Sequence, residues 1–393
     1  MQRLGFCKFV IMSEMHSRSG TELTKKLLDF LNTPVVFEEN KKISDCVNSI
    51  PDTDKIESGI KLQYLLVCKH PSRSGWLSRL GANEYAEGLP RFLGLLDNVY
   101  RPTEFGLALR QGLIPEEEKL VLRKESFNVN PLVLSISQKV FFLYCILSID
   151  GDFLIPFVNT LALKFGKNNF SYLDAGNLMP DILQKLLDRF SSTAYTKEDR
   201  RSINNLRNAI NKIDEAIKTK LEKQGSGSRR EQLTIPRLEW LIDLGFVHKI
   251  FTPESSRNYV LTEIGHSFAS KFYTSYGKLI KTKYIDEALQ SMLDEKYFTL
   301  IDVVYNQKQS ESGEQKNIIQ YLYPAYTQLK GVSGYCSVRP LLLLANSIKI
   351  ESNQAIYEYN EIKKGIESLY LENQEHLYYT TTRDGSDIQV IIN

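Results

Sequence analysis

The amino-acid sequence predicts a mainly α-helical protein with small β-hairpins, divided into several domains. Apolar residues recur at spacings of three and four over much of the chain, which favours amphipathic helices. Short β-branched and aromatic runs occur in pairs around turn residues, which favours hairpins. The 393 residues are 42% hydrophobic and 24% charged, so the chain is long enough and apolar enough to bury several cores.

Polar stretches mark the expected domain boundaries. One runs from Pro115 to Pro131, and another, at 224–230, is rich in glycine and serine and favours a hinge. A third, at 306–316, is uninterrupted polar sequence and is expected to be a loop. We therefore expect four domains, at residues 1–115, 131–224, 229–282 and 283–393.

The second of these domains is expected to be helical throughout. Residues 131–190 contain three apolar helical blocks, and residues 150–152 (Asp-Gly-Asp) are expected to form a turn between two of them. A further helix before the hinge is predicted by a single apolar stripe: Ile203, Leu206, Ile210, Ile213, Ile217 and Leu221. The stripe is short for a coiled coil between two copies, which favours packing of this helix against its own domain.

The polar side of that helix concentrates positive charge. The whole chain has 49 basic and 47 acidic residues and a net charge of +2, whereas residues 197–230 contain ten basic and five acidic residues, a local charge of +5. A solvated helix face is one explanation of this imbalance. A polyanionic partner such as nucleic acid is the other.

A helix, a hairpin and a second helix are predicted after the hinge. The first helix is expected to end at Gly245, because glycine favours helix termini. Residues 247–251 and 259–261 are expected to be strands joined by a polar turn. Thr262 can then cap a closing helix over 263–273, since its side-chain oxygen can accept a hydrogen bond from the first turn.

The same order recurs in two other parts of the chain. Residues 89–109 repeat the leucine-rich helix end and the T-E-x-G sequence of residues 241–265, with a much shorter connection. Towards the C-terminus, an apolar helix at 337–347 and an amphipathic helix at 358–372 precede two strand-like runs. The Asp-Gly pair at 384–385 separates these runs and is a strong hairpin signal.

A helix followed by a hairpin in this order resembles winged-helix DNA-binding domains, in which the hairpin is the wing and the preceding helix belongs to a helix-turn-helix unit. The resemblance implies a multi-domain array: winged-helix-like domains at 1–115 and 283–393, a helical domain at 131–224 and a winged-helix domain at 229–282. It also implies contacts to DNA phosphates or groove edges from basic side chains at these positions: Arg229, Arg230, Arg237, Lys249, Arg257, Lys363, Lys364 and Arg383. Winged helices that dock only proteins are the alternative.

No catalytic motif stands out in the sequence. A restriction-type nuclease needs clustered carboxylates and a lysine, and Asp52, Glu57 and Lys61 approach this pattern only as a diverged site. The five histidines and five cysteines are too scattered to predict a zinc site, and no glycine-rich phosphate loop occurs. We therefore expect no metal and no cofactor, and cysteines that remain thiols in a reducing compartment.

These patterns together suggest a cytoplasmic protein that binds DNA. No continuous apolar run reaches the length of a membrane span, and the first residues lack a signal-peptide pattern. The layout resembles the recognition halves of type IIS restriction enzymes and the DNA-binding subunits of prokaryotic anti-phage defence systems. That resemblance implies a recognition or adaptor protein that binds double-stranded DNA while a partner protein supplies the enzymatic activity. The alternatives are a nuclease with a diverged metal site, a transcriptional regulator and a protein-docking scaffold.

Overall fold

The protein is mainly helical and contains small antiparallel sheets, as the sequence predicts. The structure is a computed structural model. It describes residues 93–95, 102–115, 134–192, 203–204, 207–208, 210–211, 234, 237–238, 240–250, 258–279, 285–305, 318–330, 334–351, 356–372, 377–382 and 387–393.

A first group of elements lies within residues 136–279 and contains one three-stranded sheet. Its elements are α9 (Ile136–Phe165), β1 (Phe170–Ser171), α10 (Tyr172–Gly176), α11 (Met179–Ser192), β2 (Val247–Ile250), β3 (Asn258–Leu261) and α14 (Glu263–Leu279). Strand β3 pairs antiparallel with both β1 and β2, so the strand order is β1-β3-β2. The described residues within 203–211 and 234–243 are also helical.

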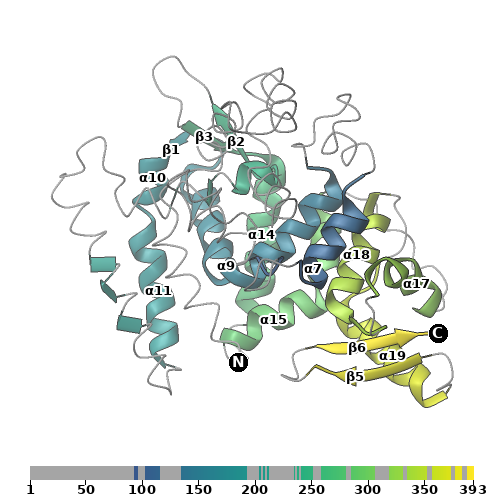
Figure 1. Cartoon of the computed structure of the whole chain (residues 1–393). Helices are drawn as coiled ribbons and strands as arrows, with labels where there is room; N and C mark the ends of the chain where they lie inside the picture. Colours follow the sequence, from purple (N-terminus) through teal and green to yellow (C-terminus); the bar gives the residue numbers. More distant parts are fainter. Residues whose placement is uncertain are drawn as a thin grey trace, which may run out of the picture.

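A second group lies within residues 285–392 and contains the other sheet. Its elements are α15 (Ile285–Glu295), α16 (Tyr297–Val304), α17 (Ile318–Leu329), β4 (Cys336–Ser337), α18 (Val338–Glu351), α19 (Tyr359–Glu372), β5 (Leu377–Thr381) and β6 (Ile388–Ile392). The predicted helix at 358–372 and the hairpin that follows it are confirmed. The strand order is β4-β6-β5, so in both sheets a short first strand pairs with the last strand. In Figure 1, the first sheet lies at the top of the molecule and β5 and β6 lie at the lower right.

Helix α9 is the central element, and it is one continuous helix of 30 residues. The turn predicted at 150–152 is therefore wrong. Gly151 lies inside the helix, and a Cβ at this position would come within 2.8 Å of the Leu289 side chain, so the glycine allows α15 to approach closely. A capping box starts the helix, because Ser135 and Gln138 each accept the other's backbone N–H.

Helix α9 is also the one helix among the described residues that is long and apolar enough to cross a membrane. An 18-residue window of it has a mean hydropathy of 1.8, and 83% of that window is buried inside the protein. The expectation that no segment reaches this length counted only continuous apolar runs, and α9 corrects it. Helices α14, α15 and α18 pack against α9, which places this apolar segment in the core of the fold.

The elements on either side of the predicted hinge pack together. Strand β1 belongs to the predicted domain 131–224 and pairs with β3 of the predicted domain 229–282. Helix α14 also packs along α9. Elements from these two predicted domains therefore share one sheet and one helix pair. The sequence did not reveal this, because the paired strands are too distant in sequence to appear as a local pattern. The hinge residues 224–230 lie outside the described residues.

The N-terminal described segment packs against the second group. It contains α7 (Glu104–Leu107) and the π-helix η1 (Ala108–Leu113). A Cβ at Gly112 would come within 2.3 Å of Leu344, so the glycine brings η1 close to α18. The Glu104 carboxylate accepts the backbone N–H of Ser337, the last residue of β4, which directly precedes α18. Buried hydrophobic residues from all three segments form one core.

Candidate nucleic-acid interface

The first hairpin, β2–β3, begins at a glycine that ends the preceding helix. Gly245 has a φ of +79°, the left-handed region that favours glycine. Its N–H donates to the carbonyl of Ile242 at 2.8 Å, and the N–H of Phe246 donates to the carbonyl of Leu241 at 2.8 Å. These two bonds form a Schellman motif. The helix end predicted at Gly245 is confirmed.

Thr262 closes the base of the same hairpin. Its backbone N–H donates to the Phe246 carbonyl at 3.0 Å, and its hydroxyl donates to the Gly245 carbonyl at 2.7 Å. The same hydroxyl oxygen accepts the N–H of Gly265 at 3.0 Å, which caps α14 as predicted. A Cβ at Gly265 would lie 2.1 Å from the Phe246 carbonyl oxygen, so only glycine lets α14 begin this close to the chain entering β2.

We call this set of threonine hydrogen bonds, to the glycine that ends one helix and to the first turn of the next, the threonine joint. The same joint recurs at Thr103. Its hydroxyl donates to the carbonyl of Gly94, which has a φ of +72°, and accepts the N–H of Gly106 at 3.2 Å. Its backbone N–H donates to the Leu95 carbonyl at 3.0 Å. Each of these bonds has a counterpart at Thr262. The T-E-x-G repeat in the sequence therefore corresponds to a repeated structural joint.

Arg237 is buried, which argues against the predicted contact of this residue with DNA. Its side chain is 2% exposed, with Nε 2.8 Å and Nη2 3.0 Å from the two carboxylate oxygens of Asp150. Its guanidinium also lies 4.7 Å from the ring centre of Phe153. Burial raises the pKa of the Asp150 carboxyl, and the charge of Arg237 opposes that rise. Every described residue within 234–243 is buried, so these residues offer no face to a groove.

Lys249 is the other described residue among the predicted contacts of the first group. It lies on β2, is half-buried, and has its ammonium nitrogen 6.0 Å from the ring centre of Tyr259, its pairing partner on β3. Arg229, Arg230 and Arg257 lie outside the described residues. In the +5 segment, the described basic residue is Arg207, which is exposed and donates to Asn204 at 3.1 Å.

Helix α19 of the second group has one exposed face. Lys364, Ser368 and Leu371 are exposed at spacings of four and three, which places them along one side of the helix. Ile362 and Ile366 lie on the opposite side and are buried. The amphipathic pattern predicted for this helix is confirmed, and it leaves one side open to a ligand.

The structure brings Lys363 and Lys364 together on α19. Lys363 is half-buried and Lys364 is exposed. Strand β5, which follows α19, exposes half of Tyr378, whose ring centre lies 6.4 Å from that of Tyr370 on α19. Arg383 follows β5 and lies outside the described residues. The surface formed by α19 and the β5–β6 hairpin is called the C-terminal surface below.

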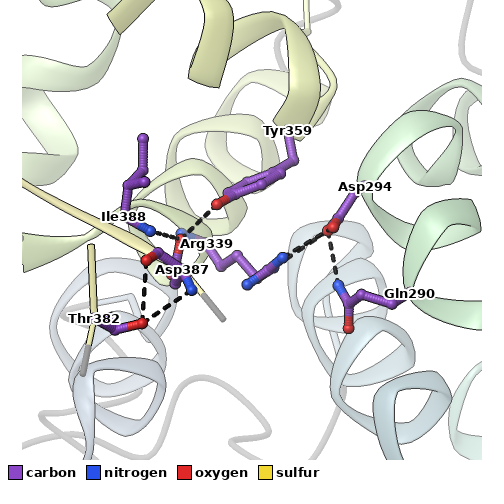
Figure 2. A network of polar contacts seen from close by, with 7 residues as sticks. All are labelled: Gln290, Asp294, Arg339, Tyr359, Thr382, Asp387 and Ile388. Carbon is purple, nitrogen blue, oxygen red and sulfur yellow. Dashed lines mark hydrogen bonds and ion pairs between the residues drawn. The ribbon is translucent and has the colours of Figure 1, made fainter. Parts of the chain in front are cut away.

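A polar network joins this hairpin to α19 and α18 (Figure 2). Asp387 accepts hydrogen bonds from the Tyr359 hydroxyl at 2.8 Å and from the backbone N–H of Arg339 at 3.0 Å. Across the hairpin, the N–H of Asp387 donates to the Thr382 hydroxyl at 3.0 Å, and the N–H of Thr382 donates to the Asp387 carbonyl at 2.9 Å. The Arg339 guanidinium continues the network to Asp294 at 2.9 Å.

Glu358 connects the start of α19 to the start of α16. Its carboxylate accepts the N–H of Thr299 at 2.7 Å and the N–H of Phe298 at 3.3 Å. Burial raises the pKa of Glu358 to about 7, and the two backbone N–H groups and the Thr299 hydroxyl oppose the rise. The sequence pattern did not indicate Glu358, Tyr359 or Asp387 because their partners are distant in sequence.

The diverged nuclease site lies outside the described residues, since Asp52, Glu57 and Lys61 all precede residue 93. Within the part of the chain that the structure describes, no group of three or more His, Cys, Asp or Glu residues could hold a metal ion. Comparisons with protein-family models, with curated proteins and with solved structures found no match. The interface is therefore argued from its own residues.

Proposed function

We propose that the protein binds double-stranded DNA through its C-terminal surface and acts as a recognition or adaptor protein. The observation that carries the proposal is the connectivity of the second group. Helix α17, strand β4, helices α18 and α19, and the β5–β6 hairpin follow one another in the order of a winged-helix domain. In such a domain, the helix before the hairpin and the hairpin itself contact DNA.

Two lysines on α19 carry the positive charge that contacts a polyanion, beside the exposed Glu361 and the half-buried Glu367. Lys363 and Lys364 supply positive charge, and Ser368 is a short side chain one turn further along, which leaves room for a close approach. Glu361 is also exposed, but its carboxylate accepts the N–H of Glu358 at 2.8 Å at the start of α19. The partial positive charge of the helix N-terminus offsets this carboxylate.

The first group is the weaker candidate for groove contact. Arg237 is held inside by Asp150, and the described part of the helix that contains it is buried. The β2–β3 hairpin, which carries Lys249, lies at another end of the molecule from the C-terminal surface (Figure 1), so it forms no part of the proposed interface. A partner enzyme and a place in restriction or anti-phage defence remain predictions from the resemblance in domain layout.

Fluorescence anisotropy with a short labelled duplex at several salt concentrations tests the proposal. Wild-type protein should bind at low salt, and log affinity should fall linearly with log salt. The variant K363A/K364A should bind more weakly, and its salt slope should fall by about one for each lysine that neutralises a phosphate in the wild type. The matched control is K185A, since Lys185 is exposed on α11 at the other side of the molecule (Figure 1). Absence of binding at low salt, or equal weakening in both variants, would overturn the proposal.

A second candidate function is protein docking at the same surface. Leu371 is 81% exposed and Tyr378 is 50% exposed, and apolar side chains of this size are frequent in protein interfaces. The salt titration separates the two functions, because a surface that docks only proteins predicts no DNA retention at any salt concentration.

A further inference from the structure

We propose that Asp387 is a positioning residue that fixes the β5–β6 hairpin relative to α19, so that both contact one DNA duplex as a preformed surface. The inference rests on the proposed function and names the residue that sets the geometry of that site.

One carboxylate links three elements. Tyr359 is the first residue of α19, Arg339 lies in the first turn of α18, and both donate to Asp387. Asp387 is 8% exposed and Tyr359 is 6% exposed. A buried carboxylate is costly unless its oxygens accept hydrogen bonds, so the bonds from Tyr359 and Arg339 hold Asp387 in this position. Figure 2 shows Asp387 between Thr382 on one side and Tyr359 and Arg339 on the other.

The hydrogen bonds of Asp387 to Tyr359 and Arg339 are called the lock below, because they join the ends of the helix and the hairpin that the chain itself does not connect. Helix α19 connects to β5 through residues 373–376, so the C-terminal end of the helix is joined covalently to the start of the hairpin. Thr382 and Asp387 lie at the far end of the two strands, and Asp387 accepts a hydrogen bond there from the N-terminal residue of α19. The helix and the hairpin are therefore held together at both ends.

Other contacts hold the hairpin as well, because its side chains Leu377, Ile388, Val390 and Ile392 are buried in the core. Strand β6 pairs with β4 at only two positions, Cys336 with Val390 and Ser337 with Gln389, and both lie on the side of β6 away from β5. Lys363 and Lys364 are about one turn from Tyr359, and Arg383 follows Thr382 directly. The lock thus joins the end of the hairpin to the part of α19 that lies next to these two lysines. A surface that is rigid before binding loses less conformational entropy when it binds.

The variant Y359F tests the lock because it removes only the hydroxyl that donates to Asp387. The ring, which lies under the Arg339 guanidinium at 4.4 Å, is retained. Hydrogen exchange without DNA should become faster in residues 377–392 and stay unchanged in α9. DNA affinity should fall about three- to tenfold, the effect of removing one buried hydrogen bond. The matched control is Y323F, because Tyr323 on α17 is 45% exposed, and it should leave exchange and affinity unchanged.

A double-mutant cycle identifies the part of the surface through which the lock acts. If Asp387 positions the hairpin, Y359F should have little further effect on affinity in an R383A background and its full effect in a K364A background. Unchanged exchange in Y359F overturns the lock even where DNA binds. Faster exchange with unchanged affinity, or full additivity with R383A, overturns the positioning role. Failure of the wild-type protein to bind DNA overturns the proposed function instead, and hydrogen exchange still decides the lock.

Discussion

Arg237 and Asp150 form a doubly hydrogen-bonded ion pair in the protein interior, although 87 residues separate them in the sequence. The two side chains are 2% and 1% exposed. The pair fastens the helix before the first hairpin to the middle of α9. A basic residue that the sequence offers as a DNA contact is thereby used to hold two distant segments together.

Replacement of Arg237 by alanine should destabilise the fold by about 3–5 kcal/mol, because it leaves Asp150 buried without its partner. Urea unfolding followed by circular dichroism measures the change. The control is K167A, since Lys167 and Glu263 form an ion pair whose side chains are 79% and 80% exposed, and its removal should leave the midpoint unchanged. Equal midpoints for R237A and K167A would show that the buried ion pair contributes no more to stability than the exposed one.

The two glycines of α14 should respond oppositely to alanine. A Cβ at Gly265 would meet the Phe246 carbonyl oxygen at 2.1 Å, so G265A should cost about 1–3 kcal/mol or more, because backbone must move. A Cβ at Gly277 meets nothing within 4 Å, so G277A should stabilise the helix by about 0.5–1 kcal/mol. Thermal unfolding of the two variants provides the comparison, and a stable G265A would refute the close approach.

Removal of the threonine hydroxyl should weaken both joints to a similar degree. T262V and T103V each remove one hydrogen bond to a glycine carbonyl and one helix cap, and each should cost about 1–2 kcal/mol. T262S and T103S keep the hydroxyl and serve as controls. Chemical denaturation should show that the serine variants retain most of the stability that the valine variants lose. If valine and serine behave alike, the hydroxyl has no role in the joint.

Glu358 should make stability depend on pH. Its pKa rises from an ordinary 4.5 to about 7 in the folded protein, so the folded chain holds this proton more tightly than the unfolded chain. The contribution to stability is complete below about pH 4.5 and is lost as the pH rises through 7.

Over that range the decrease in stability should reach about 3 kcal/mol, measured as urea midpoints at several pH values. The variant E358Q cannot ionise and should lose this slope. The control E295Q, at an exposed position on α15, should retain it. A wild-type slope in E358Q would assign the pH dependence to other groups.

Local signals predicted the elements of this fold well. The end of the helix at Gly245, the cap at Thr262 and the hairpin after α19 all follow from residues close together in sequence, because helix ends and turns need particular backbone conformations. The repeated T-E-x-G sequence was also visible without the structure, and its hydrogen bonds explain why the same residues recur.

Contacts between distant residues account for what the sequence did not reveal. Residues 150–152 have the composition of a turn, yet α9 continues through them. Asp150 forms an ion pair with Arg237, and the absence of a side chain at Gly151 leaves space for Leu289. The sequence predicted Arg237 as a DNA contact because its true partner, Asp150, is distant in sequence and cannot be inferred from neighbouring residues. Asp387 likewise gains its importance from Tyr359, 28 residues earlier.

The joint at Thr262 and its counterpart at Thr103 hold chain segments of different length. The threonine hydroxyl reaches back 9 residues at Thr103 and 17 residues at Thr262, to a glycine carbonyl in both cases. Since a doubling of loop length costs only about 0.6 kcal/mol in closure entropy, the joint tolerates either connection. The same threonine hydrogen bonds thus close the base of either connection. The length and charge of the connecting segment can therefore vary without a change in the residues packed around the threonine.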